Sequence, residues 1–416
     1  MSDFVRFGDH ISITKGKPPA LIPFDGADAA AYLTPEYMRN RAAAVPAKPG
    51  RDAVVVADDD AVLLWDGSNA GEFFRGKAGL AASTMARLRP DESFDRRYLV
   101  HALKLLEPRL KSQTTGTGIP HVDREVLEAL RMFRPDPREQ QQVAHVLDAL
   151  DTTIRKTEAI IDKLKQIKQG LLHDLLTRGI ADNGELRPPQ SEAPHLYKES
   201  ALGWLPVPWR IDVLGACASV AGGVTLGRFV SGPNTIELPY LRVANVQDGF
   251  LDLTEVKTIR VLSREVARYS LEHGDVLMNE GGDFDKLGRG VVWGGQIAQC
   301  LHQNHVFRVR CVRKLLDPDY LASYSSSARG RQFFIQSSKQ TTNLASINST
   351  QLKGFPLRLP RLAEQGAIVE IIAGLDARVR AESASLGKSQ ILKSGLMDDL
   401  LTGRVRVTPL LQRAPA

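Results

Sequence analysis

The chain contains little cysteine, few aromatic residues and no long apolar run. Its 416 residues include only three cysteines, Cys217, Cys300 and Cys311, so the sequence offers no disulfide framework and fits a reducing compartment. No apolar stretch approaches the roughly 18–20 residues that a membrane-spanning helix needs. The first ten residues lack the basic and apolar segments of a secretory signal. We therefore expect a cytoplasmic protein with no membrane partner.

A complete catalytic motif is also missing. Residues 71–78, GEFFRGKA, match the spacing of a phosphate-binding P-loop, but Ala78 stands where Mg²⁺ needs the hydroxyl of Ser or Thr. Glu280, Asp283 and Asp285 lie in a Gly-rich stretch and could hold the metal of a nuclease. The Glu-x-Lys that accompanies a strand-borne Asp in nucleases does not follow them, and a polar hairpin loop explains the stretch as well. We predict no catalytic residue.

A large excess of charge of one sign is absent as well. The net charge is +6, from 54 Lys and Arg against 48 Asp and Glu. The charge is uneven, however, because residues 301–360 hold 9 basic against 2 acidic residues and residues 75–134 hold 12 against 7. Basic side chains make the salt-dependent contacts to nucleic-acid phosphates. Two such stretches favour a nucleic-acid partner, and the alternative is a solvated basic face with polar loops.

An internal repeat is the most informative feature that is present. Residues 139–177 align with residues 364–402 without a gap, and the two copies end in the similar octets GLLHDLLT and GLMDDLLT. A proline, Pro135 or Pro360, precedes each copy at the place where a helix would begin. Weaker similarity continues upstream of both copies. Because self-similarity at a fixed spacing indicates a duplicated structural unit, we predict a globular part followed by a long helix, twice.

Each copy of the repeat has the apolar spacing of a heptad seam. The seam residues, which we expect to pair the helices, are Leu147, Leu150, Ile154, Ile161, Leu164 and Leu171 in the first copy and Ile372, Leu375, Val379, Leu386 and Leu396 in the second. About 39 residues make a helix of roughly 58 Å, which cannot bury its own stripe. We expect the two helices to pack on each other, with Lys168 and Lys393 setting their register. The alternative is that each belongs to an ordinary helix bundle.

The globular parts have the pattern of mixed strands and helices. Short β-branched runs such as AVVVADDDAVLLW and PYLRVANV are bounded by Gly, Pro, Asn and Asp, which is typical of strands. FDRRYLVHALKLL and LDPDYLASYSSSARGRQFFIQ indicate helices that follow them. The predicted fold class is α+β, and a polar stretch rich in Pro, Gly and Glu after the first long helix is predicted to be a linker.

One segment of the second globular part offers four possible zinc ligands, Cys300, His302, His305 and Cys311. The sequence HVFRVR within it alternates as a strand does. The corresponding segment of the first globular part, LAASTMARLR, contains neither Cys nor His. We therefore predict no metal site.

Several segments together resemble the specificity subunit of type I restriction-modification enzymes. They are GDVLMNEGGDFDKLGRG, QNHVFRVR, LGWLPVPW and the two leucine-rich helix ends. The order of the elements matches as well, and the resemblance covers essentially the whole chain. The departure from the better-known pattern is that no helix precedes the first globular part.

The resemblance implies two target recognition domains, each reading one half of a bipartite site in double-stranded DNA. An antiparallel pair of long coiled-coil-like helices would separate them, with a pseudo-two-fold internal repeat. The implied parts are target recognition domain 1 (1–135), long helix 1 (136–180), a linker (181–200), target recognition domain 2 (201–360), long helix 2 (361–403) and a tail (404–416).

The resemblance also implies partners and a role. The chain would be a non-catalytic DNA-reading scaffold of a host-defence system. It would carry two modification (methyltransferase) subunits and restriction subunits, which are ATP-dependent translocases and nucleases. No cofactor is expected on this chain, since S-adenosylmethionine, ATP and Mg²⁺ would belong to the partner subunits.

We expect the DNA contacts to come from polar loops at corresponding places of the two globular parts. Lys and Arg contact phosphates, whereas Asn, Gln and Arg can also read base edges. The predicted contact residues are Lys15, Lys17, Ser68, Asn69, Gln113 and Thr114 in the first part and Asn245, Gln247, Asn279, Lys286, Arg289, Gln340, Thr341 and Asn343 in the second. The alternative for such residues in Gly-rich loops is a role in forming turns.

Two other interpretations stay open at this point. A catalytic protein, such as a nuclease or an ATPase with two DNA-binding modules, would use GEFFRGKA and NEGGDFDK and would act by itself. A coiled-coil scaffold that binds no nucleic acid would require both basic stretches to be incidental.

Overall fold

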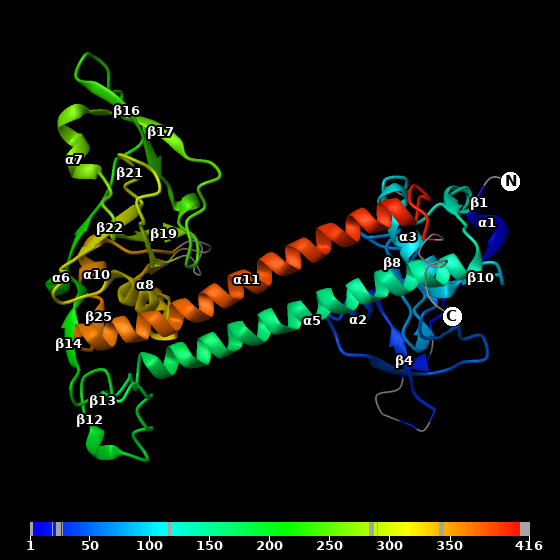
Figure 1. Ribbon diagram of the computed structural model, residues 1–416, viewed down its shortest axis with the longest axis horizontal. Coiled ribbons are helices and arrows are strands. Elements are labelled where there is room, and N and C mark those ends of the chain that lie inside the picture. The colour runs from blue at the N-terminus through cyan, green and yellow to red at the C-terminus, as the bar shows by residue number, and fades with distance from the viewer. Residues whose placement is uncertain are drawn as a thin grey trace. The chain divides into compact units, whose positions relative to one another are not determined.

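The structure is a computed structural model, shown as a ribbon in Figure 1. It describes residues 3–18, 20, 21, 26, 28–114, 118–282, 287, 288, 290–340 and 345–407. The chain forms two compact units. Unit 1 comprises residues 1–159 and 382–416, and unit 2 comprises residues 160–381.

Unit 1 combines a four-stranded and a five-stranded sheet with helices. Its elements up to the first long helix are β1 (Phe4–Arg6), α1 (Phe7–His10), β2 (Ile11–Lys15), β3 (Ala20–Leu21), β4 (Ala30–Leu33), α2 (Pro35–Met38), β5 (Val45–Lys48), β6 (Val55–Val56), β7 (Ala61–Leu64), β8 (Phe73–Arg75), β9 (Gly79–Ala81), β10 (Met85–Pro90), α3 (Arg96–Lys111), α4 (Arg124–Glu128) and β11 (Arg131–Phe133). The sheet orders are β2-β10-β7-β8 and β3-β5-β4-β9-β6, and β1 pairs with β11.

The largest core of unit 1 lies between the four-stranded sheet and α3. Leu63 and Leu88 of the strands pack with Leu99 and Leu103 of the helix, and all four side chains are fully buried. α3 begins where it does because the Asp95 carboxylate accepts hydrogen bonds from two backbone N–H groups of its first turn, at 3.0 Å each. This packing fixes α3 and the strand ends beside it.

Unit 2 repeats this architecture with several additions. Its elements between the long helices are η1 (Pro194–Leu196), β12 (Tyr197–Lys198), β13 (Leu205–Pro206), β14 (Arg210–Val213), α6 (Leu214–Cys217), β15 (Ala218–Ala221), β16 (Thr235–Leu241), η2 (Val243–Asn245), β17 (Lys257–Leu262), η3 (Ser263–Glu265), α7 (Val266–Tyr269), β18 (Val276–Asn279), β19 (Gly281–Gly282), β20 (Gly290–Val292), β21 (Leu301–His302), β22 (Val306–Cys311), α8 (Pro318–Ser326), α9 (Ala328–Ser337), β23 (Lys339–Gln340), β24 (Ala345–Ser346), α10 (Ser349–Lys353) and β25 (Pro356–Leu359). Its main sheets have the orders β15-β22-β18-β20, β17-β16-β21 and β19-β24-β23.

The two units share one order of strands. The antiparallel sheet β2-β10-β7-β8 of unit 1 corresponds to β15-β22-β18-β20 of unit 2, and in each unit a helix capped by an Asp follows the second of these strands. The parallel pair β4–β9 corresponds to β16–β21, and the pair β1–β11 corresponds to β14–β25. Each unit mixes strands and helices, as the predicted class requires.

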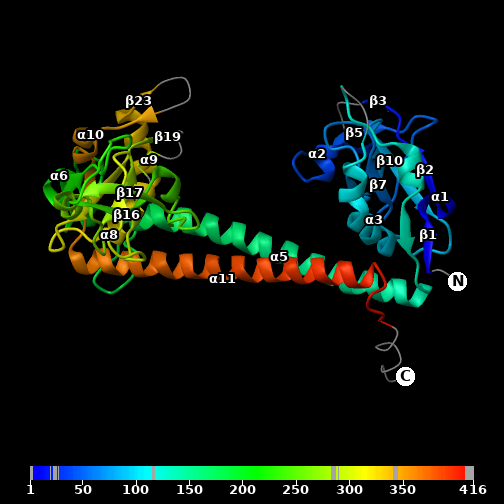
Figure 2. The ribbon, with the colours of Figure 1, turned by 90° about the horizontal axis from the view of Figure 1, so that it is seen from above.

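The two long helices are α5 (Pro137–Leu175) and α11 (Leu362–Leu400), each of 39 residues. Within unit 1, the first part of α5 lies beside the last part of α11, and within unit 2 the last part of α5 lies beside the first part of α11 (Figures 1 and 2). The helices are therefore antiparallel in each unit. Among the described residues, no helix is long and apolar enough to cross a bilayer.

The predicted division of the chain differs from the observed one in two respects. The sequence treats each long helix as a separate part, whereas each helix contributes one portion to each compact unit. The stretch predicted as a linker, residues 181–200, is ordered against unit 2. Its Arg187 and Ala193 are buried, and the Arg187 guanidinium forms an ion pair with Glu364 of α11. Buried side chains of this kind tie the stretch to the unit.

Candidate nucleic-acid interface

The predicted seam residues lie on the partly or fully buried side of the long helices. Leu147, Ile161, Leu164 and Ile372 are buried, and Leu150, Ile154, Leu171, Leu375, Val379, Leu386 and Leu396 are half-buried. In unit 1, Leu147 shares a core with Leu400 of α11. In unit 2, Ile372 and Leu175 share another. The pairing role of the seam stays a prediction, and this burial supports it.

Both seam lysines have carboxylate partners on the opposite helix. Lys168 bonds to Asp376 in unit 2, and Lys393 bonds to Asp151 in unit 1. Asp376 and Lys393 occupy the positions in the second copy of the repeat that Asp151 and Lys168 occupy in the first, so the two ion pairs are equivalent. The heptad spacing placed the two lysines in the seam, but it did not show with which acidic residues they form ion pairs.

A buried glutamine at the start of each long helix ties it to its globular part. The Gln140 amide accepts from the N–H of Asp95 at 2.7 Å and donates to the carbonyl of Pro135 at 2.9 Å. In unit 2, Gln365 accepts from the N–H of Asp317 at 2.8 Å and donates to the carbonyl of Pro360 at 3.0 Å. Because both amides are fully buried, α3 and α8 have fixed positions on their long helices.

Five of the six contact residues predicted in unit 1 lie around one loop. Lys15 forms an ion pair of 2.7 Å with Asp66 at the start of this loop. Ser68 and Asn69 are exposed on it, and Gly71, at φ +92°, passes close to Lys111 at the end of α3. Gln113, which is exposed, and Thr114 follow directly. The sixth residue, Lys17, pairs instead with Asp52 at 3.4 Å.

A basic groove adjoins this loop within unit 1. It has a volume of about 650 Å³, and its lining includes the basic residues Arg39, Arg41, Arg75, Lys77, Lys104, Lys111 and Arg155, with Asn69 at its edge. The only acid in the lining is Glu72, which is bound to Arg39. Among the described residues, Arg41 and Arg155 have no carboxylate partner. The groove therefore offers free positive charge to an anion.

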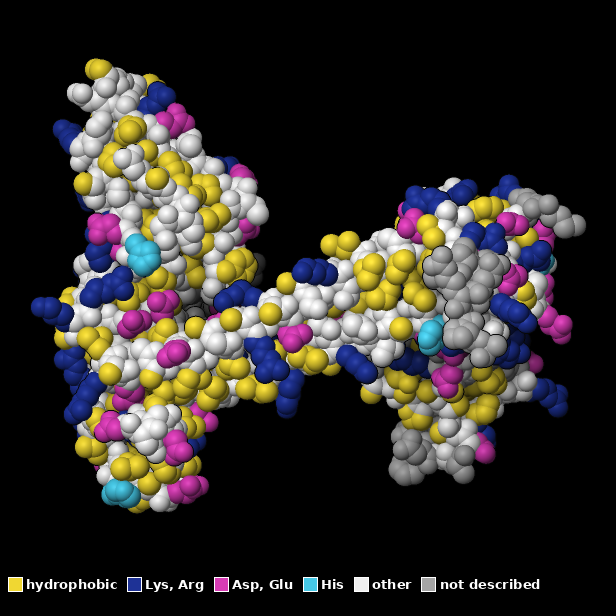
Figure 3. Space-filling view, in the orientation of Figure 1, with side chains coloured by type: hydrophobic (Ala, Val, Ile, Leu, Met, Phe, Trp, Pro, Cys, Tyr) yellow, Lys and Arg dark blue, Asp and Glu magenta, His cyan; other side chains and the backbone are white. Residues whose placement is uncertain are grey.

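Carboxylates behind the groove hold several of its cations in place. Glu107 accepts hydrogen bonds from Lys104 at 2.8 Å and from Lys111 at 2.6 Å. Burial by itself raises the pKa of Glu107, but these hydrogen bonds outweigh burial and lower the pKa below its usual range. Glu107 is thus an anion at neutral pH, and it orients two ammonium groups toward the groove. Figure 3 shows basic and acidic side chains side by side on unit 1.

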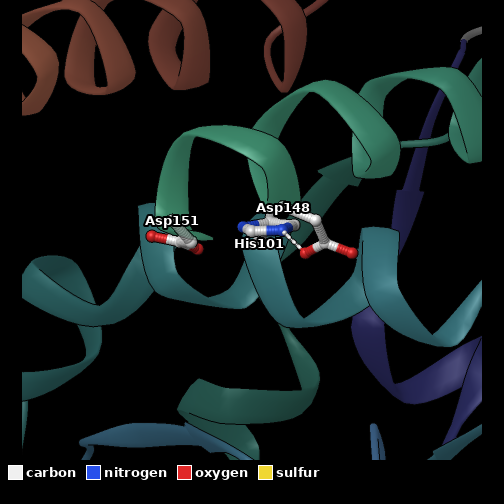
Figure 4. A group of neighbouring side chains, drawn as sticks. All are labelled: His101, Asp148 and Asp151. Atoms are coloured by element: carbon white, nitrogen blue, oxygen red, sulfur yellow. Dashed lines mark hydrogen bonds and ion pairs between the residues drawn. The ribbon is translucent and has the colours of Figure 1, made fainter. Parts of the chain in front are cut away.

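A histidine and two aspartates come together between α3 and α5 in unit 1 (Figure 4). The ligand atoms of His101, Asp148 and Asp151 lie within 4.8 Å of one another, and His101 Nε2 lies 2.9 Å from Asp148 Oδ1. Arg75 binds Asp148, and Lys393 binds Asp151. Burial lowers the pKa of His101 despite Asp148. Because both carboxylates are already balanced by cations, the cluster is an ion-pair network that fixes α3 on α5.

Two residues predicted to contact DNA in unit 2 are buried. Asn279 is fully buried, and its amide donates to the carbonyl of Val246 at 3.1 Å. Asn245 is also buried, and its amide donates to the carbonyls of Asp252 and Glu255. Both amides bond within unit 2, which lends these two predictions no support, and they stay predictions.

The other predicted contacts in unit 2 are only partly visible. Gln247 is half-buried and donates to the carbonyl of Ala244 at 2.7 Å. Lys286, Arg289, Thr341, Asn343 and the side chain of Gln340 lie outside the described residues. The structure therefore does not place the predicted contacts of unit 2 in one site.

The four possible zinc ligands do not form a cluster in the described part of the chain. His302 is buried against the carbonyl of Val306, whereas His305 is exposed and lies 2.6 Å from Glu280. Cys300 and Cys311 are buried thiols, and burial raises the pKa of each to about 12. The absence of a zinc site stays a prediction.

The P-loop-like segment also has another structure. β8, a turn and β9 replace the strand–loop–helix that a P-loop needs. Lys77 Nζ lies 2.7 Å from Asn40 Oδ1 and 3.2 Å from the carbonyl of Tyr37. The lysine is thus held against the α2 end rather than over a loop of backbone N–H groups.

We expect His302 to make unit 2 sensitive to acid. Its Nδ1–H donates to the carbonyl of Val306 at 2.6 Å, and burial lowers its pKa to about 4, against about 6.5 in the unfolded chain. The contribution of neutral His302 to the free energy of unfolding is complete above pH 6.5. It is lost as the pH falls toward 4, because between these pH values only the unfolded chain binds a proton at this residue. The loss is about 3 kcal/mol.

The measurement is urea unfolding between pH 7 and pH 4.5, followed by the fluorescence of Trp293, which packs near Val306. His302→Asn keeps an N–H donor but has no titrating group. The free energy of unfolding of this variant should therefore fall less steeply with pH, by the amount that the uptake of one proton causes. Equal slopes for the variant and the wild type would show that His302 is not the sensor.

Comparisons with known proteins agree with this geometry. Residues 4–166 match a family model described as the type I restriction modification DNA specificity domain. The chain is 29% identical over 421 residues to the type I restriction enzyme MjaVIII specificity subunit of Methanocaldococcus jannaschii, an alignment that covers 98% of this chain and 94% of that protein.

Solved structures show the same fold. A type I restriction-modification S subunit from M. genitalium has a TM-score of 0.59 at 14% identity, covering 96% of this chain and 95% of that one. A chain from a structure concerned with complex assembly and conformational transition of a type I restriction-modification system has a TM-score of 0.51 at 16% identity, covering 95% and 96%. The sequence match over nearly the whole length and these folds lead to one conclusion. Over nearly its whole length, the chain is similar to specificity subunits of type I restriction-modification enzymes.

Proposed function

We propose that the chain reads a bipartite site in double-stranded DNA and holds the subunits that modify and restrict that DNA. The observation that carries the proposal is the duplication. The two units repeat one strand order and carry one equivalent ion pair each, Lys168–Asp376 and Lys393–Asp151. Two related but diverged globular parts are suited to reading two half-sites that differ in sequence.

In the first unit, the loop of Ser68 and Asn69, the end of α3 and the basic groove form the proposed DNA interface. Exposed amides and hydroxyls can read base edges. The guanidinium groups of Arg41 and Arg155, which have no carboxylate partner among the described residues, can neutralise phosphates. Gln113 stays a predicted base contact because it is exposed at the end of α3. DNA binding should accordingly weaken as the salt concentration rises.

The long helices would form an antiparallel coiled-coil spacer with a pseudo-two-fold axis. Such an axis lets two copies of one modification subunit dock in equivalent ways. Apolar side chains that remain exposed on the helices support this docking role. They include Ile391 and Leu392 of α11 in unit 1 and Ile160 and Ile167 of α5 in unit 2.

The chain would supply recognition and no chemistry. S-adenosylmethionine, ATP and Mg²⁺ would be bound by the modification and restriction subunits, and the complex would act in the cytoplasm against foreign DNA. The alternative, a nuclease or ATPase that acts by itself, gains no support from the described residues, and Asp283 and Asp285 lie outside them. Lys77 is held by Asn40, and Glu280 is engaged by His305.

The test combines the chain with its modification subunits and maps methylated bases by sequencing. We expect methylation at one site made of two short specific sequences separated by a spacer of constant length, and no methylation by the modification subunits alone. The chain alone should show no methyl transfer, ATP hydrolysis or DNA cleavage. Methylation at scattered sequences, or cleavage that co-purifies with the chain alone, would contradict the proposal.

A further inference from the structure

Helix α9 of unit 2 presents an exposed polar face. Arg329, Gln332 and Gln336 are all exposed, and at 100° per residue they fall within an arc of about 60°. Lys339, also exposed, follows in β23, which lies on the side of unit 2 away from the start of α11 (Figure 2). Four long polar side chains of α9 and β23 are thus exposed to solvent within one short region.

These four side chains are free to bind a ligand. Within the described ranges, none of them takes part in a hydrogen bond or an ion pair with another side chain or with the backbone. Their neighbours differ in this respect. Arg331, on another side of the helix, pairs with Asp248 at 3.3 Å, and the buried Arg358 donates to the carbonyl of Leu202. The polar face is therefore not used for holding the fold together.

The opposite face of α9 holds the helix rigidly. Phe334 is fully buried, and its ring centroid lies 4.7 Å from that of Phe355. Ser327 caps the first turn by accepting from the N–H of Gly330 at 3.2 Å. At Gly330 any Cβ would lie 2.3 Å from the carbonyl oxygen of Ser325, so the two helices α8 and α9 meet backbone to backbone. A rigid helix avoids the entropy cost of ordering its backbone when a ligand binds.

The stretch of chain that contains α9 is basic, which favours a polyanionic ligand. Residues 320–363 contain six Lys and Arg and no Asp or Glu. A merely solvated helix face in a soluble protein commonly mixes both signs. Arg makes paired hydrogen bonds to guanine, and Gln makes them to adenine, in the major groove. From Arg329 to Gln336 the helix rises about 10.5 Å, which spans about three base pairs.

We propose that α9 enters the major groove of the half-site read by unit 2. Arg329, Gln332 and Gln336 face the bases, and Lys339 contacts a phosphate. This inference rests on the proposed function and assigns its reading element in unit 2. It differs from the sequence-based prediction, which placed the contacts of this unit in loops.

The experiment uses the full chain assembled with its modification subunits. Wild-type complex first defines the methylated site by sequencing, and binding to a duplex with that site is then measured. Arg329→Ala, Gln332→Ala and Gln336→Ala should each weaken binding about 5- to 150-fold and relax the base preference in one half-site only. Lys339→Ala should weaken binding to all sequences alike and lower the salt slope by about one.

Arg264→Ala is the matched control, because Arg264 is an exposed arginine elsewhere in unit 2. It should bind and methylate as the wild type does. Gln332→Glu adds a positive test, since a carboxylate accepts from cytosine rather than adenine. It should move the preferred base at one position toward cytosine.

The outcomes separate the inference from the function. A wild-type complex that methylates no defined sequence overturns the proposed function and this inference with it. A wild-type complex with a defined site, whose specificity and affinity stay unchanged in all three alanine variants, overturns the inference alone. Thermal unfolding of each variant shows whether its fold is kept, and these exposed helical positions tolerate Ala well.

Discussion

A half-chain of residues 1–190 should form a dimer. In the full chain, Leu147 of α5 packs in one core with Leu400, Leu401 and the half-buried Leu396 of α11. Removing residues 191–416 uncovers this part of α5, and each large apolar side chain is worth roughly 1.5–3 kcal/mol when it is buried. The best replacement for α11 is the α5 of a second half-chain, because two near-identical antiparallel helices are self-complementary about a two-fold axis.

The repeat gives the contacts that such a dimer should make. Lys168 of one copy would meet Asp151 of the other, in place of the pairs Lys168–Asp376 and Lys393–Asp151. Each dimer has this pair twice, by symmetry. Lys168→Glu should therefore weaken the dimer, and Lys168→Glu combined with Asp151→Lys should restore it.

Light scattering at micromolar concentration gives the mass of each variant. With modification subunits added, the half-chain should also direct methylation to a symmetric site, made of the first half-site and its inverted copy. A folded half-chain that remains monomeric would mean that the long helices do not pair through their seams. The spacer proposal would then fail.

The long helices were the part of the fold that the sequence predicted best. Their predicted ranges, 136–180 and 361–403, differ from the observed Pro137–Leu175 and Leu362–Leu400 by a few residues at the ends. A long apolar stripe is a local signal of a helix. Its repetition without a gap in the second half of the chain made a chance pattern an inadequate explanation. Helix ends are less well predicted because the last turns depend on capping contacts with distant residues.

The DNA-contact residues are the part of the candidate site that the sequence defines least, for a physical reason. Asn279 ends a strand beside a Gly-rich stretch, and this context fits an exposed loop as well as a buried amide. Only the folded chain shows that its Nδ2 donates to the carbonyl of Val246, 33 residues away. For α9, which we propose as a reading element, the sequence does hold a usable signal. Arg329, Gln332 and Gln336 follow a helical spacing in a region without acidic residues. α8 and α9 were, however, predicted together from one segment, so the polar face of α9 was not distinguished.

The strongest effect of a single substitution is expected at Glu364. This carboxylate lies near the start of α11 and binds the guanidinium of Arg187 through two oxygens, and it also accepts from the N–H of Ile180 at 2.8 Å. The Arg187 side chain is only 7% exposed. Glu364→Ala would leave this charge buried without a carboxylate partner, which costs about 3–5 kcal/mol.

Glu139 is the matched control, because it occupies the position in the first copy of the repeat that Glu364 occupies in the second, and it has an equivalent role in unit 1. It binds Arg406 and accepts from the N–H of Val407 at 2.9 Å. The Arg406 side chain is 41% exposed, so water can replace the carboxylate when Glu139 is removed. We expect Glu139→Ala to cost clearly less than Glu364→Ala, mainly through the lost backbone hydrogen bond of about 1 kcal/mol.

Urea unfolding followed by tryptophan fluorescence measures the difference, since three of the four tryptophans, Trp204, Trp209 and Trp293, belong to unit 2. The double variant Arg187→Met with Glu364→Met removes both charges and should recover much of the stability lost in Glu364→Ala, because apolar side chains can replace a buried ion pair. Hydrogen exchange of amides 131–147 reports on unit 1 for Glu139→Ala. If Glu364→Ala had the same urea midpoint of unfolding as the wild type, water or another group would have to replace the carboxylate at Arg187. The stretch 181–200 would then not be held to unit 2 by this pair.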